Sequence, residues 1–266
     1  MSGEIAETPI YLALTRAFNV GRVRTVISSG QAVVLHRITM QSKDGDWLIR
    51  EDEEACAAVL AALAARGAHY RYGAPLHPRW LAGGWSSHLE FSQDGLRIRT
   101  DFVSRPPRLP ANRLAALWRE AETADTPVVG IPDLIELKRT DRERDYVIIG
   151  ALAQRLGDPA IELAHGRDPE RIAGLLRDHP ALLAAASAVR PWLASVHDAE
   201  TIAERLDAER RADMRRNRER LAGYTNAAVR WQDAWPRLAE RIGSLSLPAA
   251  HAAMCAAADG LLPESP

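Results

Sequence analysis

Residues 26–33 read Val-Ile-Ser-Ser-Gly-Gln-Ala-Val, and residues 44–49 read Asp-Gly-Asp-Trp-Leu-Ile. In the first stretch an apolar run ends in small residues and an amphipathic segment follows, which predicts a strand, a tight turn and a short helix. The second stretch predicts another strand, in which alternate side chains share a face. Asp44 and Asp46 are therefore expected to point the same way and to lie close together.

Two carboxylates held this closely repel each other unless a cation lies between them. Hard oxygen ligands suit Mg²⁺, which binds carboxylates together with substrate phosphates. The small residues Ser29 and Gly30 would let backbone N–H groups at the start of the short helix approach a phosphate. The two stretches together indicate a site for a metal ion and a nucleotide.

Each of these features also has a purely structural interpretation. Asp-Gly is a common turn dipeptide, so residues 43–46 also fit a surface turn. The pair Ser29-Gly30 also fits an ordinary strand-to-helix turn, and Lys43, which could help to bind phosphate, also fits a solvated lysine. The residues alone leave both interpretations open.

The pattern resembles the nucleotidyltransferase superfamily, which includes DNA polymerase beta, antibiotic nucleotidyltransferases and several toxin–antitoxin proteins. The family signature is an apolar run, Gly-Gly or Gly-Ser, a spacer, and then Asp-x-Asp or Asp-x-Glu. Here Ser29-Gly30, thirteen intervening residues, and Asp44 and Asp46 occupy those places. The resemblance covers residues 10–156 and implies that Ser29 and Gly30 bind the nucleotide.

The resemblance also implies a third carboxylate on a later strand, and Asp101 in the segment 96–103 fits that place. Gln93-Asp94-Gly95 predicts the hairpin turn that leads into this strand. Three carboxylates on neighbouring strands can hold a pair of Mg²⁺ ions for phosphoryl or nucleotidyl transfer. The candidate catalytic residues and metal ligands are therefore Asp44, Asp46 and Asp101.

A further part of the resemblance is the stretch Asp-Leu-Ile-Glu-Leu-Lys at residues 133–138. In the family a lysine at this place contacts the phosphates of the nucleotide, which implies the same role for Lys138. A solvated helix position is the alternative for this lysine. Asp145 follows seven residues later, and we expect it to cap a helix or to pair with Arg142 or Arg144 rather than to bind metal.

The alternation of strand and helix signals predicts an α+β domain over residues 1–157, with a nucleotidyltransferase-like mixed sheet flanked by helices. Gly157-Asp158-Pro159 predicts a boundary, and residues 158–266 predict an all-helical C-terminal domain. A formal net charge of −1 gives no overall attraction to nucleic acid or to a membrane. The first residues show no signal-peptide pattern, so we expect a cytoplasmic protein without a membrane partner.

A long charged helix is predicted between residues 198 and 221. Arginines from Arg205 to Arg220 alternate with acidic residues at three- and four-residue spacing, which fits a self-neutralised solvated face. The alternative is a face that contacts phosphates of RNA or of another acceptor.

The resemblance implies a Mg²⁺-dependent enzyme that moves a nucleoside monophosphate from an NTP to a hydroxyl of an RNA, a protein or a small molecule. The sequence departs from the family at Ser29, where glycine is usual, and at Gly45, where an apolar branched residue is usual. These departures support the alternative of a non-catalytic nucleotide- or partner-binding module, such as one component of a toxin–antitoxin pair. We expect Gly45 to loosen the Asp-x-Asp strand, because it removes the side chain that anchors the strand from behind.

Overall fold

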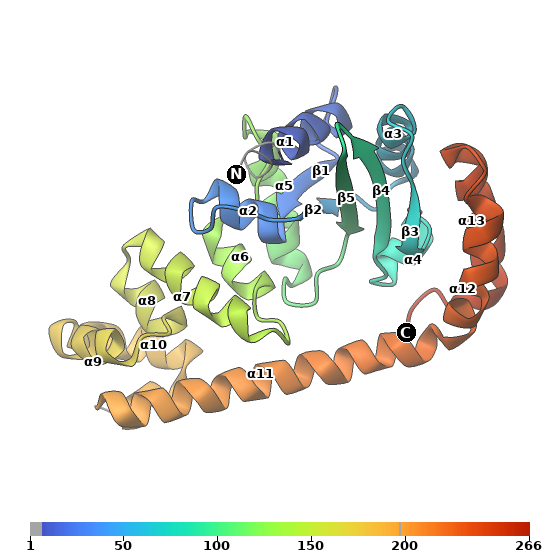
Figure 1. Cartoon of the computed structure of the whole chain (residues 1–266). Helices are drawn as coiled ribbons and strands as arrows, with labels where there is room; N and C mark the ends of the chain where they lie inside the picture. Colours follow the sequence, from blue (N-terminus) through green and yellow to red (C-terminus); the bar gives the residue numbers. More distant parts are fainter. Residues whose placement is uncertain (1–6, 197) are drawn as a thin grey trace. The chain divides into compact units, whose positions relative to one another are not determined.

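The computed structural model describes residues 7–196 and 198–266, and its central feature is a five-stranded sheet (Figure 1). The strands in spatial order are β1 (Thr25–Ser28), β2 (Asp44–Ile49), β5 (Leu96–Val103), β4 (Ser87–Gln93) and β3 (His69–Gly73). Strand β2 is parallel to β5, and the other neighbours are antiparallel. This mixed sheet with flanking helices confirms the predicted α+β class.

The chain forms two compact units, Met1–Val129 with Ala222–Pro266, and Gly130–Leu221. Besides the sheet, the first unit contains α1 (Glu7–Phe18), α2 (Ser29–Leu35), α3 (Glu53–Ala64), α4 (Pro78–Ala82), α5 (Ala111–Glu122), α12 (Val229–Ile242) and α13 (Leu247–Leu261). The second contains α6 (Ile131–Leu137), α7 (Glu143–Leu156), α8 (Pro159–His165), α9 (Pro169–Asp178), α10 (Leu183–Val189) and most of α11 (Ala199–Ala227). No helix in the described ranges is long and apolar enough to cross a membrane.

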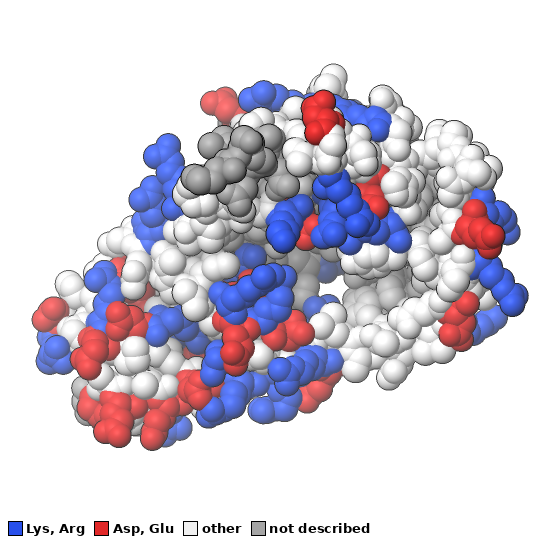
Figure 2. All heavy atoms as spheres, viewed as in Figure 1, with Lys and Arg blue, Asp and Glu red and all other residues white. Residues whose placement is uncertain are grey.

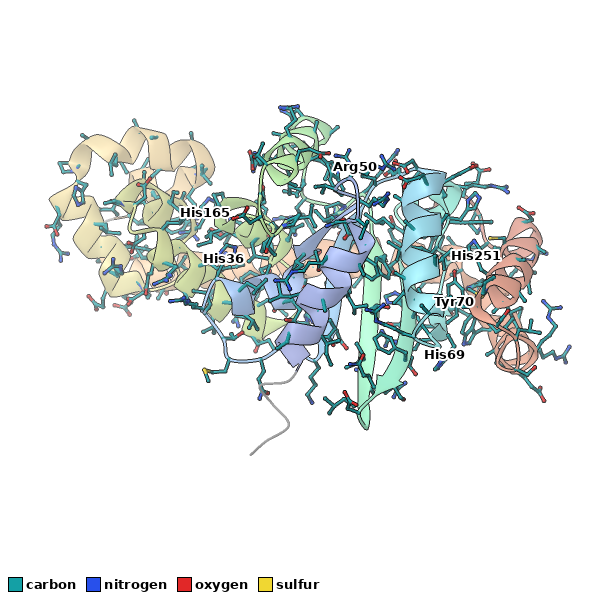
Figure 3. All side chains as sticks on the ribbon, turned by 90° about the horizontal axis from the view of Figure 1, so that it is seen from above. His36, Arg50, His69, Tyr70, His165 and His251 are labelled. Atoms are coloured by element: carbon teal, nitrogen blue, oxygen red, sulfur yellow. The ribbon has the colours of Figure 1, made fainter. Side chains whose placement is uncertain are left out.

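These units differ from the division at residue 157 that the sequence suggested, because the end of the chain packs back onto the sheet unit. Helix α13 packs against α3 and β3, and α12 against β3. The indole of Trp231 donates to the Gly73 carbonyl over 3.2 Å. The Tyr70 hydroxyl lies 2.7 Å from Nδ1 of His251, and Figure 3 labels both side chains. Such contacts join residues far apart in sequence, which local patterns do not predict.

A cluster of aromatic rings forms the core under one face of the sheet. Trp47 of β2 stacks on Phe102 of β5 at 5.4 Å between ring centroids, and Phe18 of α1 meets both rings edge-on. The Trp47 indole N–H donates to the hydroxyl of Thr15 over 2.9 Å. Because Trp47 and Phe102 point to this face, the residues that alternate with them on β2 and β5 point to the opposite face. Those residues include the candidate carboxylates.

The order of elements before the candidate site follows the sequence prediction of strand, turn, helix, loop and strand over β1, α2 and β2. The hairpin turn at Asp94-Gly95 is also present, and both residues have positive φ angles, +52° and +79°. The segment between β3 and β4 contains the short helix α4, which begins with Pro78 at its first turn.

Candidate functional site

The turn between β1 and α2 lies directly beside the Asp-x-Asp strand. Ser29 adopts a φ of +46°, a left-handed conformation that is uncommon for a residue other than glycine. The N–H of Gly30 donates to Oδ2 of Asp46 over 3.4 Å. A Cβ atom on Gly30 would collide with the hydroxyl of Ser42, so the loop before β2 lies tightly against the turn. The turn and Asp46 therefore form one local structure.

The register of the sheet brings the candidate carboxylates together. Asp46 lies opposite Asp101 in the parallel pair of β2 and β5, and Asp44 lies opposite Arg99. Paired residues on adjacent strands are about 5 Å apart, so Asp46 and Asp101 are immediate neighbours on one face. Gly45 alternates with the two aspartates and points to the aromatic core instead.

The carboxylates contact basic side chains from other strands of the sheet. Oδ1 of Asp101 lies 2.8 Å from Nη2 of Arg71 and 2.8 Å from Nδ1 of His88, and Oδ1 of Asp44 lies 3.2 Å from Nη1 of Arg99. Figure 2 shows basic and acidic side chains gathered over β5 and β4. Within the described residues, no three His, Cys, Asp or Glu side chains converge closely enough to hold a metal ion.

A fourth acidic residue on this face, Glu90, is held more firmly than the three aspartates. Glu90 of β4 receives two hydrogen bonds from Arg97, of 2.8 and 2.7 Å, and its carboxylate lies 3.4 Å from His69. Burial acts to raise the pKa of Glu90, but the hydrogen bonds and charge of Arg97 outweigh it, and the pKa is lowered. Glu90 is thus ionised and already bound by a complete arginine fork.

Gly45 makes room for the aromatic core. A Cβ atom at this position would lie 2.5 Å from Cη2 of Trp47 and 2.5 Å from Cδ1 of Tyr11. The Tyr11 hydroxyl donates to the carbonyl of Lys43 over 3.0 Å, which fixes the start of β2. The expectation that Gly45 loosens this strand is therefore wrong, since two aromatic rings fill the space that a branched side chain would take.

Lys138 lies in the other unit, Gly130–Leu221, directly after α6. Its side chain is only 5% exposed, and its Nζ lies 3.7 Å from Oδ1 of Asp145. The interpretation of Lys138 as a solvated helix residue is therefore wrong. Asp145 pairs with Arg142 over 2.8 Å and accepts from the Thr140 hydroxyl over 2.6 Å, which confirms the predicted structural pairing of Asp145.

Sequence reasoning missed Arg71, His88 and Arg99 as members of the site. Arg99 could have been predicted from the sequence, because Arg99 and Asp101 are two residues apart on one strand and must share a face. Arg71 and His88 lie on β3 and β4, and only the strand order and register bring them to Asp101. No local sequence pattern carries that information.

No protein-family model and no curated protein matches the chain. Its fold is similar to a crystal structure described as that of a "putative nucleotidyltransferase from H. pylori". That similarity covers 82% of this chain and 98% of the other, with 12% sequence identity and a TM-score of 0.43.

Proposed function

We propose that the chain transfers a nucleoside monophosphate from an NTP to a hydroxyl group, with Mg²⁺ as cofactor and pyrophosphate as leaving group. One observation carries the proposal: Asp46 lies opposite Asp101 and also accepts the N–H of Gly30 in the turn. A carboxylate pair and a small-residue turn thereby adjoin at one place. Nucleotidyl transfer needs this combination, because it depends on positioning and on neutralisation of phosphate charge.

Each residue has a distinct task in this proposal. The backbone N–H groups of the Ser29-Gly30 turn and the Ser29 hydroxyl bind the triphosphate. Asp101 accepts the proton of the attacking hydroxyl. Asp44, Asp46 and Asp101 would hold Mg²⁺, which would supply positive charge to stabilise the leaving pyrophosphate.

The donor set fits Mg²⁺ in chemistry, since Asp46 lies opposite Asp101 and Mg²⁺ is bound by one or two carboxylates together with substrate phosphates. Asp44 and Asp101 have exposed side-chain fractions of 40% and 18%, so an ion can reach them. Their contacts with Arg99 and Arg71 must be exchanged for contacts with the metal. The exposed Asp44–Arg99 pair contributes at most about 1 kcal/mol, so a divalent ion can displace it.

Labelled NTP provides the test. The purified chain is incubated with each α-³²P-labelled NTP, Mg²⁺ and a cell extract, and transfer of label reports both activity and acceptor class. The double variant Asp44→Asn, Asp46→Asn keeps the size of both side chains and removes the charge. Labelling by wild type that is lost in this variant and on addition of EDTA supports the proposal. Equal labelling by the double variant would contradict it.

The alternative is a non-catalytic module that binds a nucleotide or a protein partner, such as one component of a toxin–antitoxin pair. The contacts of Arg71 with Asp101 and of Arg99 with Asp44 favour this alternative, because internal cations already neutralise the carboxylates. Calorimetric titration with NTP separates the two functions. An enzyme binds NTP only with Mg²⁺, whereas a module of the alternative kind shows no metal-dependent NTP binding.

RNA is the acceptor that helix α11 favours. Arg211, Arg215 and Arg218 are exposed and lie at four- and three-residue spacing, so they form one stripe along the helix. Arg211 pairs with Asp207, whereas Arg215 and Arg218 form no ion pair with any described residue. If RNA binds this stripe, Arg215→Ala together with Arg218→Ala should lower RNA affinity and reduce its salt dependence. Equal RNA binding by the double variant would exclude α11.

A further inference from the structure

Three arginines extend from β3 and β5 on the charged side of the sheet, and each contacts a carboxylate. Arg71 contacts Asp101, Arg99 contacts Asp44, and Arg97 contacts Glu90. Arg97 and Arg99 are two residues apart on β5 and therefore share a face. The three arginines differ in how many of their N–H donors are used.

The guanidinium of Arg97 forms the complete fork with Glu90, through Nε at 2.8 Å and Nη2 at 2.7 Å. Arg99 makes one bond of 3.2 Å with Asp44, and its side chain is 34% exposed. A guanidinium carries five N–H donors in one plane, a geometry that suits bidentate binding of carboxylate or phosphate. Arg99 therefore keeps most of its donors for another acceptor.

Arg71 is in a similar position, although it is more buried. Its Nη2 donates to Asp101 over 2.8 Å, but its buried Nε has no hydrogen-bond acceptor. The nearest acid to that nitrogen is Glu90, at 3.6 Å, and Glu90 is already bound by Arg97. A buried N–H without an acceptor is unfavourable by about 1–3 kcal/mol, so an incoming anionic oxygen would bind favourably here.

The balance of charges in the site indicates an anionic ligand for Arg71 and Arg99. Asp44, Asp46 and Asp101 carry three negative charges, and Arg71 and Arg99 return two positive ones. A divalent ion that binds the carboxylates takes away the acceptors of both arginines. A triphosphate that arrives with the metal supplies new acceptors, in the bidentate form that arginine prefers.

We propose that Arg71 and Arg99 are phosphate ligands of the nucleotide, which Asp101 and Asp44 hold in place until a divalent metal takes those carboxylates. The inference rests on the proposed function and adds two binding residues to it. The variants should therefore affect nucleotide binding and metal binding in different ways. Loss of either arginine must weaken nucleotide binding and must not weaken metal binding, because the arginine competes with the metal for one carboxylate.

Isothermal titration calorimetry of the full chain tests this demand with two probes, Mg²⁺ alone and a non-hydrolysable α,β-methylene NTP in the presence of Mg²⁺. The variants are Arg71→Ala and Arg99→Ala, and Arg97→Ala is the matched control from the same face. We expect Arg71→Ala and Arg99→Ala to weaken analogue binding about tenfold or more, since a hydrogen bond to a charged group contributes about 1.5–3 kcal/mol. Mg²⁺ alone should bind them at least as tightly as it binds wild type.

Arg97→Ala should change neither affinity, and Arg71→Lys should restore only part of the analogue affinity, because lysine keeps the charge and loses the fork. Analogue binding unchanged in both alanine variants overturns this inference and leaves the proposed function intact. Parallel loss of analogue and Mg²⁺ binding also overturns it, since that result indicates a structural role. A wild-type chain that binds Mg²⁺ but no analogue contradicts the proposed function as well.

Discussion

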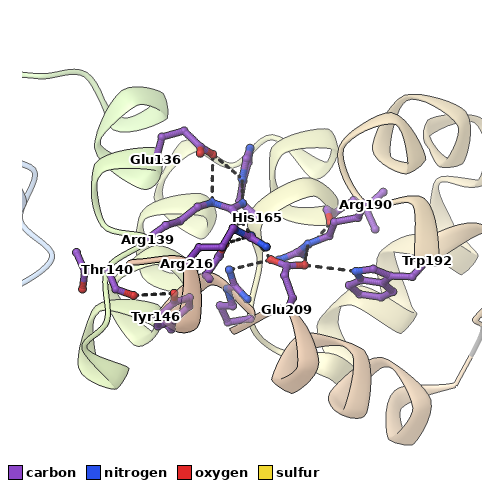
Figure 4. Close-up of polar contacts among 12 residues, drawn as sticks. Glu136, Arg139, Thr140, Tyr146, His165, Arg190, Trp192, Glu209 and Arg216 are labelled. Atoms are coloured by element: carbon purple, nitrogen blue, oxygen red, sulfur yellow. Dashed lines mark hydrogen bonds and ion pairs between the residues drawn. The ribbon is translucent and has the colours of Figure 1, made fainter. Parts of the chain in front are cut away.

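Two clusters of arginines and carboxylates, one in each unit, use the same chemistry at different depths. On the sheet, Arg99 and Asp44 have side chains that are 34% and 40% exposed. In the helical unit, Glu209 of α11 is 16% exposed and Arg190 is 2% exposed. The second set, which we name the Glu209 cluster, consists of Glu209, Asp213, Arg139, Arg167 and Arg190 (Figure 4).

The geometry of the Glu209 cluster is convergent. Arg190 and Arg167 each lie 3.0 Å from a Glu209 oxygen, and Arg139 lies 3.4 Å away. These arginines follow α10, α8 and α6, so one carboxylate connects three helices to α11. Burial acts to raise the pKa of Glu209, but the charges of Arg190 and Arg167 outweigh it and lower the pKa.

The difference indicates which charges can serve a ligand. A buried carboxylate with converging partners cannot lose one of them cheaply, because no water replaces it. A half-exposed carboxylate with one arginine partner can exchange that partner for a metal at small cost. Burial therefore points to a structural role for Glu209, whereas the exposed Asp44 keeps the freedom to exchange partners that the proposed metal site requires.

The largest expected effect on stability comes from a substitution that disrupts the Glu209 cluster. Glu209→Gln leaves three arginines without their shared negative charge, and we expect it to lower the free energy of unfolding by about 3–5 kcal/mol. Denaturant unfolding of the full chain measures the loss, and hydrogen exchange shows whether it falls on residues 130–221. Glu204→Gln is the control, since Glu204 is exposed on the same helix. Asp44→Asn on the sheet should cost less than about 1 kcal/mol.

If Glu209→Gln is no more destabilising than Glu204→Gln, depth of burial does not separate the two clusters. If Asp44→Asn is as destabilising as Glu209→Gln, the sheet carboxylates are structural as well.

A smaller effect concerns the support behind the sheet carboxylates. Gly45→Ala places a Cβ atom 2.5 Å from Trp47 and Tyr11, and overpacking of this kind costs about 1–3 kcal/mol. Thermal unfolding measures the loss. Gly223→Ala is the matched control, because a Cβ atom there meets nothing within 4 Å. Adding Trp47→Phe to Gly45→Ala should recover part of the stability; no recovery would mean that the indole does not occupy the space behind Gly45.

Gly45 also shows how far sequence reasoning reaches. The placement of Asp44 and Asp46 on one face follows from the two-residue period of a strand, and the hairpin before Asp101 follows from Asp94-Gly95. The role of Gly45 does not follow, because its missing side chain is replaced by a ring from α1 and by the folded-back indole of Trp47. Local periodicity predicts which face a residue occupies but not what fills the space next to it.

Local sequence patterns also do not predict the order and register of strands that are far apart in the chain. Arg71 reaches Asp101 because β3, β4 and β5 are adjacent in that order, and His88 because it lies opposite Asp101. The return of α12 and α13 to the sheet unit is equally non-local. The face and strand positions of Asp44 and Asp46 could thus be predicted, whereas the ion-pair partners of the carboxylates and the bounds of the units could not.

Acid should affect the buried cluster through His165. Burial is the main cause that lowers the pKa of this imidazole to about 4, and the charges of Arg139 and Arg190 add to it, while Glu209 opposes it. Arg139 lies 3.2 Å from Nδ1 of His165, and this nitrogen must be unprotonated to accept a hydrogen bond. The folded chain therefore holds His165 neutral.

The direction of the change in stability with pH follows from the pKa of His165 in the unfolded and in the folded chain. Because the unfolded chain takes up the proton near pH 6.5 and the folded chain near pH 4, stability is complete above 6.5 and falls as the pH decreases toward 4. Between pH 7 and pH 5 the neutral state of His165 accounts for a loss of about 2 kcal/mol in the free energy of unfolding. Denaturant unfolding at both values should show a smaller loss for His165→Gln than for wild type. His251, whose pKa burial lowers to about 4, titrates in both proteins and cancels in the comparison. Equal losses would mean that His165 is protonated in the folded state.

The smallest expected effect lies in the turn beside Asp46. Ser29 holds a φ of +46°, which costs a residue with a Cβ about 1–2 kcal/mol and glycine almost nothing. The added flexibility of glycine in the unfolded chain offsets part of that gain, so Ser29→Gly should stabilise the fold by about 0.5–1 kcal/mol. Ser28→Gly is the neighbouring control, because its φ of −131° suits any residue, and it should destabilise.

Binding of the nucleotide analogue shows whether the strained conformation of Ser29 has a function. If the Ser29 hydroxyl binds the triphosphate, Ser29→Gly must gain stability and lose affinity for Mg²⁺ with the methylene NTP analogue in the same protein. Backbone strain that persists beside a binding site is maintained when the strained side chain has a task that glycine cannot perform. A variant that gains stability and keeps full analogue affinity would show that backbone N–H groups alone form the phosphate site. The strain at Ser29 would then have no function in ligand binding, and the half-exposed carboxylates would need only the shape of the turn beside them.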